Sequence, residues 1–147
     1  MVICLFGESC TGKSTIAGKI KARIGAKIFT GKDWVKLAKS EPEAKHIFVE
    51  LLKTHELDND LIIYVITEKE HLALLPERAT KILVTAELSV IKERFAKRMN
   101  GNLPVPVAAA LEKKHGMFDG EKHDLLIVDG EEPLSAVCDK IISFYGV

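Results

Sequence analysis

One stretch near the N-terminus constrains the fold of this chain more than any other: Gly7-Glu8-Ser9-Cys10-Thr11-Gly12-Lys13-Ser14. It matches the pattern G-x-x-x-x-G-K-[S/T] in full, follows the apolar run of residues 2–6 and precedes an amphipathic segment. Glycines let the backbone curl so that N–H groups converge on phosphate oxygens, and the following helix directs its positive end at the same point. Because strand, loop and helix stand in register, a chance glycine-rich turn is a poor explanation. The motif predicts a nucleoside triphosphate site.

The positions of this loop have different expected roles. The ammonium of Lys13 is expected to bridge the β- and γ-phosphates, and the Ser14 hydroxyl is expected to hold Mg²⁺. Thr15 is expected near the α-phosphate. Cys10 lies close to the converging N–H groups, where it is either a reactive thiol or a small residue that the loop tolerates. The remaining expected nucleotide contacts are Gly7, Glu8, Ser9, Thr11 and Gly12.

The rest of the chain alternates short apolar runs with longer amphipathic segments. The expected strands are residues 2–6, 26–29, 61–66, 81–85 and 124–128. The expected helices are residues 13–24, 33–38, 43–52, 88–99, 107–115 and 134–144. Continuous apolar strands that alternate with helices indicate a parallel sheet covered on both faces. The 147 residues contain no repeat or long linker, so we expect a single three-layer α/β/α domain over residues 1–147.

The amino-acid composition limits the kinds of molecule that the protein is expected to bind. The apolar fraction is 47% and the charged fraction 29%, which excludes intrinsic disorder. The 21 basic and 21 acidic residues cancel, which argues against nucleic acid or an anionic membrane as the main partner. No apolar run approaches the length of a membrane span. The three cysteines are odd in number and lack metal-ligand spacing, so we expect a reduced, cytoplasmic protein with a small-molecule partner. The sequence sets no oligomeric state.

Three further stretches carry recognisable patterns. They are residues 29–34 (Phe-Thr-Gly-Lys-Asp-Trp), 93–98 (Glu-Arg-Phe-Ala-Lys-Arg) and 123–130 (His-Asp-Leu-Leu-Ile-Val-Asp-Gly). Together with the phosphate loop they resemble the P-loop small-molecule kinases of the nucleoside monophosphate kinase group, such as guanylate, adenylate and cytidylate kinases. They are also similar to chloramphenicol phosphotransferase-like proteins. The resemblance implies a P-loop NTPase fold with five parallel strands in the order 2-3-1-4-5. It also implies ATP and Mg²⁺ as cofactors, an acceptor-binding region at about residues 31–60 and a lid at about residues 98–107.

The resemblance also assigns roles to single residues. In the first stretch, Asp33 is expected to meet the acceptor hydroxyl, or else to cap a helix. In the second, Arg94 and Arg98 lie on one helical face, as in a lid whose guanidiniums stabilise the transferring phosphoryl group. The alternative is a solvated basic helix face. In the third, Gly130 is expected beside the adenine ring, although a plain last strand with a turn explains the pattern equally well.

The sequence departs from the kinase pattern after the third strand. An acidic residue commonly orders Mg²⁺ there, but the chain has Thr67 and Glu68 in place of an aspartate. Glu68 is expected either to take that metal role through its longer side chain or to begin the next helix, where the dipole favours glutamate. The guanylate kinase substrate pattern and the Gly-Gly pair of shikimate kinases are both missing.

These observations predict an ATP-dependent kinase that moves the γ-phosphoryl group to a small acceptor, most plausibly a nucleoside monophosphate or a nucleoside. Lys13, Arg94, Arg98 and Asp33 are the expected catalytic residues. One alternative is a non-catalytic ATP-binding regulatory protein. Another is a kinase of a non-nucleotide hydroxyl acceptor, since nothing in residues 31–60 diagnoses the acceptor.

Overall fold

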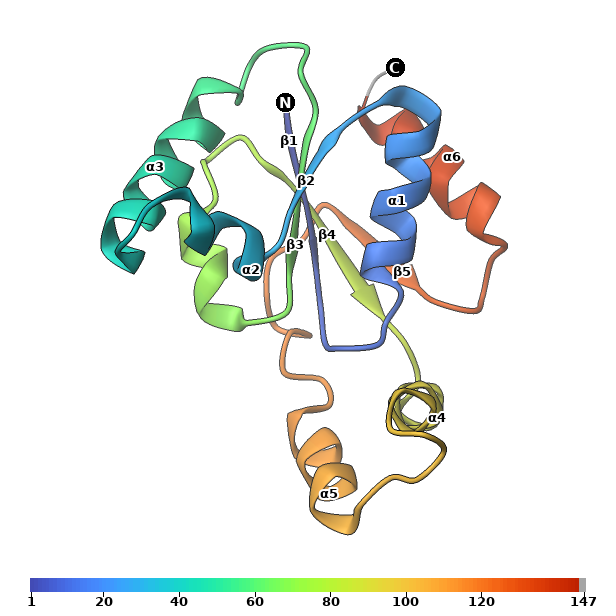
Figure 1. Cartoon of the computed structure of the whole chain (residues 1–147). Coiled ribbons are helices and arrows are strands. Elements are labelled where there is room, and N and C mark those ends of the chain that lie inside the picture. Colours follow the sequence, from blue (N-terminus) through green and yellow to red (C-terminus); the bar gives the residue numbers. More distant parts are fainter. Residues whose placement is uncertain (146–147) are drawn as a thin grey trace.

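A computed structural model describes residues 1–145 and contains one parallel sheet of five strands (Figure 1). The strands are β1 (Val2–Phe6), β2 (Lys27–Phe29), β3 (Ile62–Ile66), β4 (Thr80–Thr85) and β5 (Leu125–Val128). Their order is β2-β3-β1-β4-β5, as the resemblance predicts. In the central pairings, Val2 lies opposite Ile62 and Ile3 lies opposite Thr80.

Helices connect successive strands. The α-helices are α1 (Lys13–Ile24), α2 (Gly31–Trp34), α3 (Glu41–Thr54), α4 (Leu88–Arg98), α5 (Val105–Lys114) and α6 (Leu134–Tyr145). Two 3₁₀ helices, η1 (Val35–Leu37) and η2 (Lys69–Leu74), complete the described elements. Figure 1 shows α1 and α6 on one face of the sheet and α3 on the other. Within residues 1–145, no helix is both long and apolar enough to span a membrane.

Alternation along β1 divides the core into two apolar layers. Ile3 and Leu5 pack against α1 and α6, where Ile16 and Ile20 contribute to the same cluster. The layer on the other face of the sheet contains the remaining residues of β1 and is rich in aromatic side chains. Its largest members, all fully buried, are Phe6, Trp34, Phe48, Tyr64 and Phe118. All five residues of β1 are buried, as expected for a central strand covered on both faces.

The helices α4 and α5 form a separate unit beyond the carboxyl ends of the strands, as Figure 1 shows below the sheet. The chain turns between them at Asn100 and Gly101, both of which have positive φ. The amide of Gly101 donates to the carbonyl of Ala96 over 2.7 Å and so closes the end of α4. We call residues 88–114 the lid helices. They include the whole of residues 98–107, the segment that the resemblance predicts as a lid.

The structure changes some expected boundaries for physical reasons. The helix expected at residues 33–38 begins earlier, at Gly31, because Thr30 and Asp33 form a capping box. It then passes into 3₁₀ geometry at Val35. The helix expected at 107–115 begins at Val105, since Pro106 is tolerated in a first helical turn. The remaining boundaries move by one or two residues.

Candidate active site

The phosphate loop connects β1 to α1 and its backbone depends on two glycines. A Cβ atom on Gly7 would lie 2.1 Å from the carbonyl oxygen of Val84, so only glycine fits against β4. Gly12 has φ +96°, a left-handed conformation that side chains disfavour. Cys10 also has positive φ, at 64°. This curled backbone is the cradle that the motif predicts.

Lys13 lies in the first turn of α1 and is buried, with 5% of its surface exposed. Its Nζ donates to the carbonyl of Gly7 over 2.8 Å and also to the carbonyl of Glu8. The pKa of Lys13 is lowered to about 8, mainly by burial and to a smaller extent by the charge of Arg98, while Cys10 and Glu8 oppose the shift. The ammonium is therefore held inside the loop by carbonyl oxygens, which makes it available to an anion that enters the cradle.

A cavity of about 540 Å³ opens beside the loop. Ser14, from α1, faces it together with Thr67 and Glu68, which follow β3. The opposite wall comes from the start of α2 and includes Lys32 and the buried Trp34. The cavity therefore joins the expected metal-binding hydroxyl to residues 30–41, which include the beginning of the predicted acceptor region.

Asp33 points its carboxylate back along the chain rather than into this cavity. Its Oδ2 accepts from the Thr30 amide over 2.8 Å and from the Thr30 hydroxyl over 2.9 Å. Asp33 does not line the cavity, whereas its neighbours Lys32 and Trp34 do. The alternative of helix capping holds in a different form, because Thr30 is the N-cap residue and Asp33 completes the capping box from the third helical position.

Glu68 does lie at the cavity, but its neighbour in space is His71. The Glu68 Oε2 atom is 3.7 Å from His71 Nε2. His71 in turn packs the edge of its ring against Trp34, with ring centroids 5.6 Å apart. Glu68 also precedes η2 as its N-cap residue. The structure thus places Glu68 near Ser14 around one cavity and leaves its metal role as a prediction.

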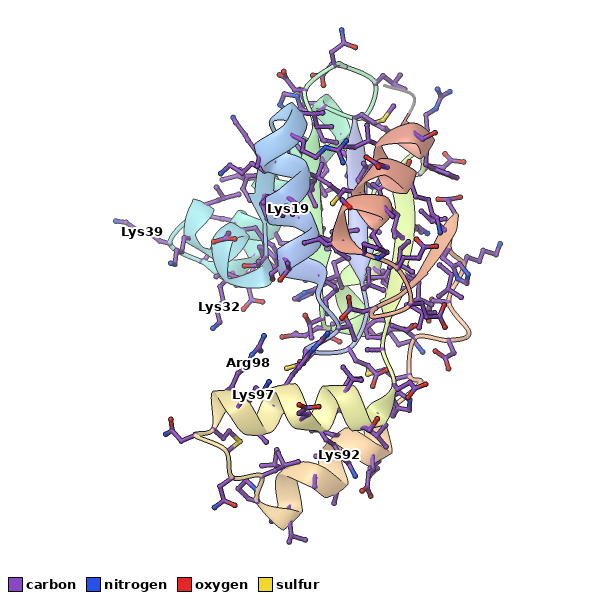
Figure 2. All side chains as sticks on the ribbon, turned by 90° about the vertical axis from the view of Figure 1, so that its right-hand side faces the viewer. Lys19, Lys32, Lys39, Lys92, Lys97 and Arg98 are labelled. Carbon is purple, nitrogen blue, oxygen red and sulfur yellow. The ribbon has the colours of Figure 1, made fainter. Side chains whose placement is uncertain are left out.

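The two lid arginines lie differently. Arg94 donates to the carbonyl of Cys10 over 3.0 Å and forms an ion pair with Asp129, which follows β5. Arg98 lies one turn further along α4 and is exposed. Figure 2 shows Arg98 rising from α4 toward the body of the protein, on the side where Lys32 lies. Its charge is one of the smaller contributions that lower the pKa of Lys13.

Solved structures resemble the chain over nearly its whole length, although no family model and no curated protein sequence matches it. The tunicamycin resistance protein of Deinococcus radiodurans has a TM-score of 0.70 at 16% identity, covering 99% of this chain and 95% of its own. Shikimate kinase from Acinetobacter baumannii, in complex with shikimate, has a TM-score of 0.66 at 15% identity, with 98% and 92% covered. A gluconokinase from Sinorhizobium meliloti 1021 has a TM-score of 0.61 at 15% identity, with 97% and 89% covered. The chain has the P-loop kinase fold.

Within this P-loop kinase fold, most of the predicted nucleotide-site residues gather around the first turn of α1. Ser14 and Thr15 are exposed there, and Thr11 is buried with its hydroxyl donating to the Glu8 carbonyl over 3.1 Å. Gly130 is exposed in the turn after β5 with φ +92°. The thiol of Cys10 packs with Ala86 and Ile91 in a small apolar cluster, which fits the interpretation of Cys10 as a small tolerated residue.

Sequence reasoning missed four participants of the site. Asp129 holds Arg94, and its carboxylate lies 3.3 Å from the position that a Cβ of Gly12 would occupy. His71 lines the cavity beside Glu68. His115 and the Gly116 amide each bind the Glu8 carboxylate over 3.1 Å. Only Asp129 offered a signal in the sequence, because it stands in the Asp-Gly pair after the last predicted strand. The other contacts join residues far apart in the chain.

Proposed function

We propose that the protein is an ATP-dependent phosphotransferase that moves the γ-phosphoryl group of ATP to a small acceptor. The observation that carries the proposal is the cavity of about 540 Å³ that reaches from Ser14, next to the buried Lys13 of the phosphate loop, to α2. A site that only bound the nucleotide phosphates would not need a cavity that extends from the first turn of α1 to α2. The P-loop kinase fold supports the same conclusion.

The residues present fit a magnesium nucleotide. Ser14 offers the hydroxyl that would hold Mg²⁺, and Glu68 is one of two acidic residues around the same cavity, the other being Glu41. The ion would neutralise phosphate charge. The chain's own part is to bind the phosphates with the loop amides and Lys13, and to stabilise the transferring group with Arg98 from the lid. Arg94 supports the site by holding the Cys10 carbonyl.

In the transfer, the bond from the γ-phosphorus to its bridging oxygen breaks and a bond to the acceptor oxygen forms. The acceptor proton passes to solvent and ADP leaves. Such reactions depend on positioning and electrostatics rather than on a covalent enzyme intermediate. We place the acceptor in the cavity between α2 and η2 and expect a nucleoside monophosphate or a nucleoside. A non-nucleotide alcohol is the second candidate, since the walls offer hydroxyl partners in Thr67, Glu68 and His71.

The test is ADP release from Mg-ATP across nucleoside monophosphates, nucleosides and small hydroxylated metabolites. Stimulation by one acceptor, lost in Lys13→Ala, is the expected result. Lys19→Ala is the matched control, because Lys19 lies on the same helix with its side chain in solvent (Figure 2). ATP binding without stimulation by any acceptor would instead favour the regulatory protein. The pairing of Arg94 with Asp129 is the feature that fits this rival, because the arginine is already engaged without nucleotide.

A further inference from the structure

Helix α5 is apolar in sequence yet buries none of its residues, all of which the structure describes. Its first seven residues are Val-Pro-Val-Ala-Ala-Ala-Leu, and Val105 is 81% exposed. Apolar residues of this kind normally cover a core. On α5 the inner residues instead face a second cavity, of about 570 Å³, between the lid helices and the body of the protein.

One wall of this second cavity, which we call the lid cavity, is apolar. It consists of Phe95, Val107, Ala110, Leu111 and Met117. The phosphate loop forms part of the polar side through Glu8 and Ser9. An apolar wall beside a phosphate site is suited to the uncharged part of an organic molecule.

The lid cavity adjoins the acceptor cavity. Thr67 and Glu68, at the carboxyl end of β3, line both. A molecule whose hydroxyl lies near Ser14 would reach the lid cavity by extending past Thr67, with its other end under α5. We therefore take the occupant of the lid cavity to be part of the acceptor.

The charges around the lid cavity do not suit a phosphate group. The Glu8 carboxylate is bound by His115 and the Gly116 amide, so it serves the protein's own backbone. Lys69 is paired with Glu121 over 3.2 Å. Among the described lining residues there is no arginine, and Lys114 shares the cavity with the carboxylates of Glu68 and Glu70. The acidic residues outnumber the lysines, which opposes binding of an anion.

We propose that the acceptor is an alcohol that carries an uncharged apolar group, of the size of an aromatic ring, bound in the lid cavity. The alcohol oxygen takes the γ-phosphoryl group, its proton passes to solvent, and the apolar group stays against Val107, Leu111 and Met117. This inference rests on the proposed phosphotransferase function. It narrows the acceptors proposed above to a nucleoside or a non-nucleotide alcohol and excludes a nucleoside monophosphate, whose acceptor oxygen belongs to a phosphate. Glycerol-like polyols and sugar phosphates lack the group that the lid cavity selects.

Methionine methyl NMR tests the binding step without requiring turnover. The chain has three methionines, of which Met117 lines the lid cavity. Met1 precedes the central strand β1, at the amino ends of the strands, and Met99 follows α4. The probe is 3-phenoxy-1,2-propanediol, compared with glycerol, each with and without Mg-ADP. The phenoxy compound is expected to shift the Met117 methyl signal in a saturable way and to leave Met1 unchanged. Equal responses to the two alcohols, or no response of Met117, would overturn the inference.

Two valines of α5 provide a matched pair of variants. Val107 lines the lid cavity, whereas Val105 points into solvent two residues earlier. Val107→Asn should weaken binding of the phenoxy probe by roughly tenfold, because a polar amide replaces apolar surface. Val105→Asn should bind it like the wild type. Equal loss in both variants, or in neither, contradicts a specific apolar site.

Turnover separates this inference from the function on which it rests. ADP release is measured with glycerol, its phenoxy ether, ribose, phenyl riboside and ribose 5-phosphate. A kcat/KM at least tenfold higher for each aryl compound than for its parent supports the inference. Preference for the parent alcohols or for ribose 5-phosphate overturns it and leaves the kinase proposal standing. A Met117 response without acceptor-stimulated ADP release supports the apolar site and counts against the kinase.

Discussion

Arg94 of α4 and Asp129 after β5 form an ion pair beside the phosphate loop. The same guanidinium donates to the Cys10 carbonyl, so one side chain connects the lid helices, the loop and the end of the last strand. These two contacts of Arg94 fix the position of α4 relative to the phosphate loop. They thereby set where Arg98, one helical turn later, can place its charge.

Arg98 and Arg94 should both be needed for turnover, for different reasons. Arg98→Ala removes a cation that stabilises the transferring group, and we expect kcat to fall by about a hundredfold or more. Arg94→Ala frees α4 from the loop, so kcat should fall and the KM for ATP should rise. Steady-state ADP release measures both effects.

Lys97→Ala is the control on the same helix. Lys97 is exposed, and its only ion pair among the described residues is a 3.8 Å contact with Glu93, so its loss should leave kcat within about twofold. If Arg94→Ala retained full activity, the assignment of α4 to the active site would be wrong.

Two glycines should respond oppositely to alanine. In Gly7→Ala the new Cβ would lie 2.1 Å from the Val84 carbonyl oxygen, so β1 or β4 must move. We expect a loss of about 3 kcal/mol or more in the free energy of unfolding. Gly18 lies in the interior of α1 with no atom within 4 Å of its Cβ position. Gly18→Ala should therefore stabilise the protein by about 0.5–1 kcal/mol. Urea denaturation of both variants provides the measurement, and equal effects would contradict the close contact at Gly7.

The sequence was sufficient to predict the strands, the helices and the phosphate loop, because these depend on local signals. Apolar strands, helical spacing and the glycine positions around Lys13 are all encoded within short segments. The sheet order and the assignment of the two arginines to a lid came from the resemblance to P-loop kinases. The partners of these arginines were not predicted, because Arg94 meets Asp129 through packing of segments that are 35 positions apart in the chain.

Asp33 and Glu8 are two further residues whose side-chain contacts the sequence pattern did not predict. Asp33 stood in a substrate-like pattern, but the nearest donors to its carboxylate were three residues away in Thr30. Local capping therefore determined its conformation. Glu8 was expected to contact nucleotide, and in the structure its carboxylate binds Gly116 and His115 at the far end of the lid helices. No local pattern predicts such a contact.

The Glu8 contacts should hold the end of the lid helices against the phosphate loop. Glu8→Ala removes the partner of the Gly116 amide, so we expect a loss of about 1–2 kcal/mol in the free energy of unfolding. Hydrogen exchange should become faster at Gly116 and along residues 105–117. Glu93→Ala is the control, since Glu93 is exposed on α4 and pairs only with Lys97. Exchange rates that are unchanged in Glu8→Ala would show that other contacts hold this segment.

Buried Lys13 should make stability depend on pH in the alkaline range. Burial lowers its pKa from 10.5 to about 8 in the folded chain without nucleotide. Between these values the unfolded chain holds more protons on Lys13 than the folded chain does, so stability rises with pH. The penalty for the buried charge is fully present below pH 8 and is removed as the pH approaches 10.5. The full penalty in the free energy of unfolding is about 3 kcal/mol, because the pKa falls from 10.5 to about 8 and each pKa unit corresponds to 1.36 kcal/mol.

Urea denaturation between pH 7 and 10.5, without nucleotide or Mg²⁺, tests this dependence. Relative to Lys13→Met, which has no titrating group at this position, wild type should gain stability steadily above pH 8. Lys19→Met should follow the wild-type curve, because Lys19 is exposed on the same helix. Parallel curves for wild type and Lys13→Met would show that Lys13 is not desolvated.

Phosphate oxygens favour the charged ammonium, so ATP binding above pH 8 should take up a proton and weaken as the pH rises. Calorimetric titration of ATP in two buffers of different ionisation enthalpy would detect that proton.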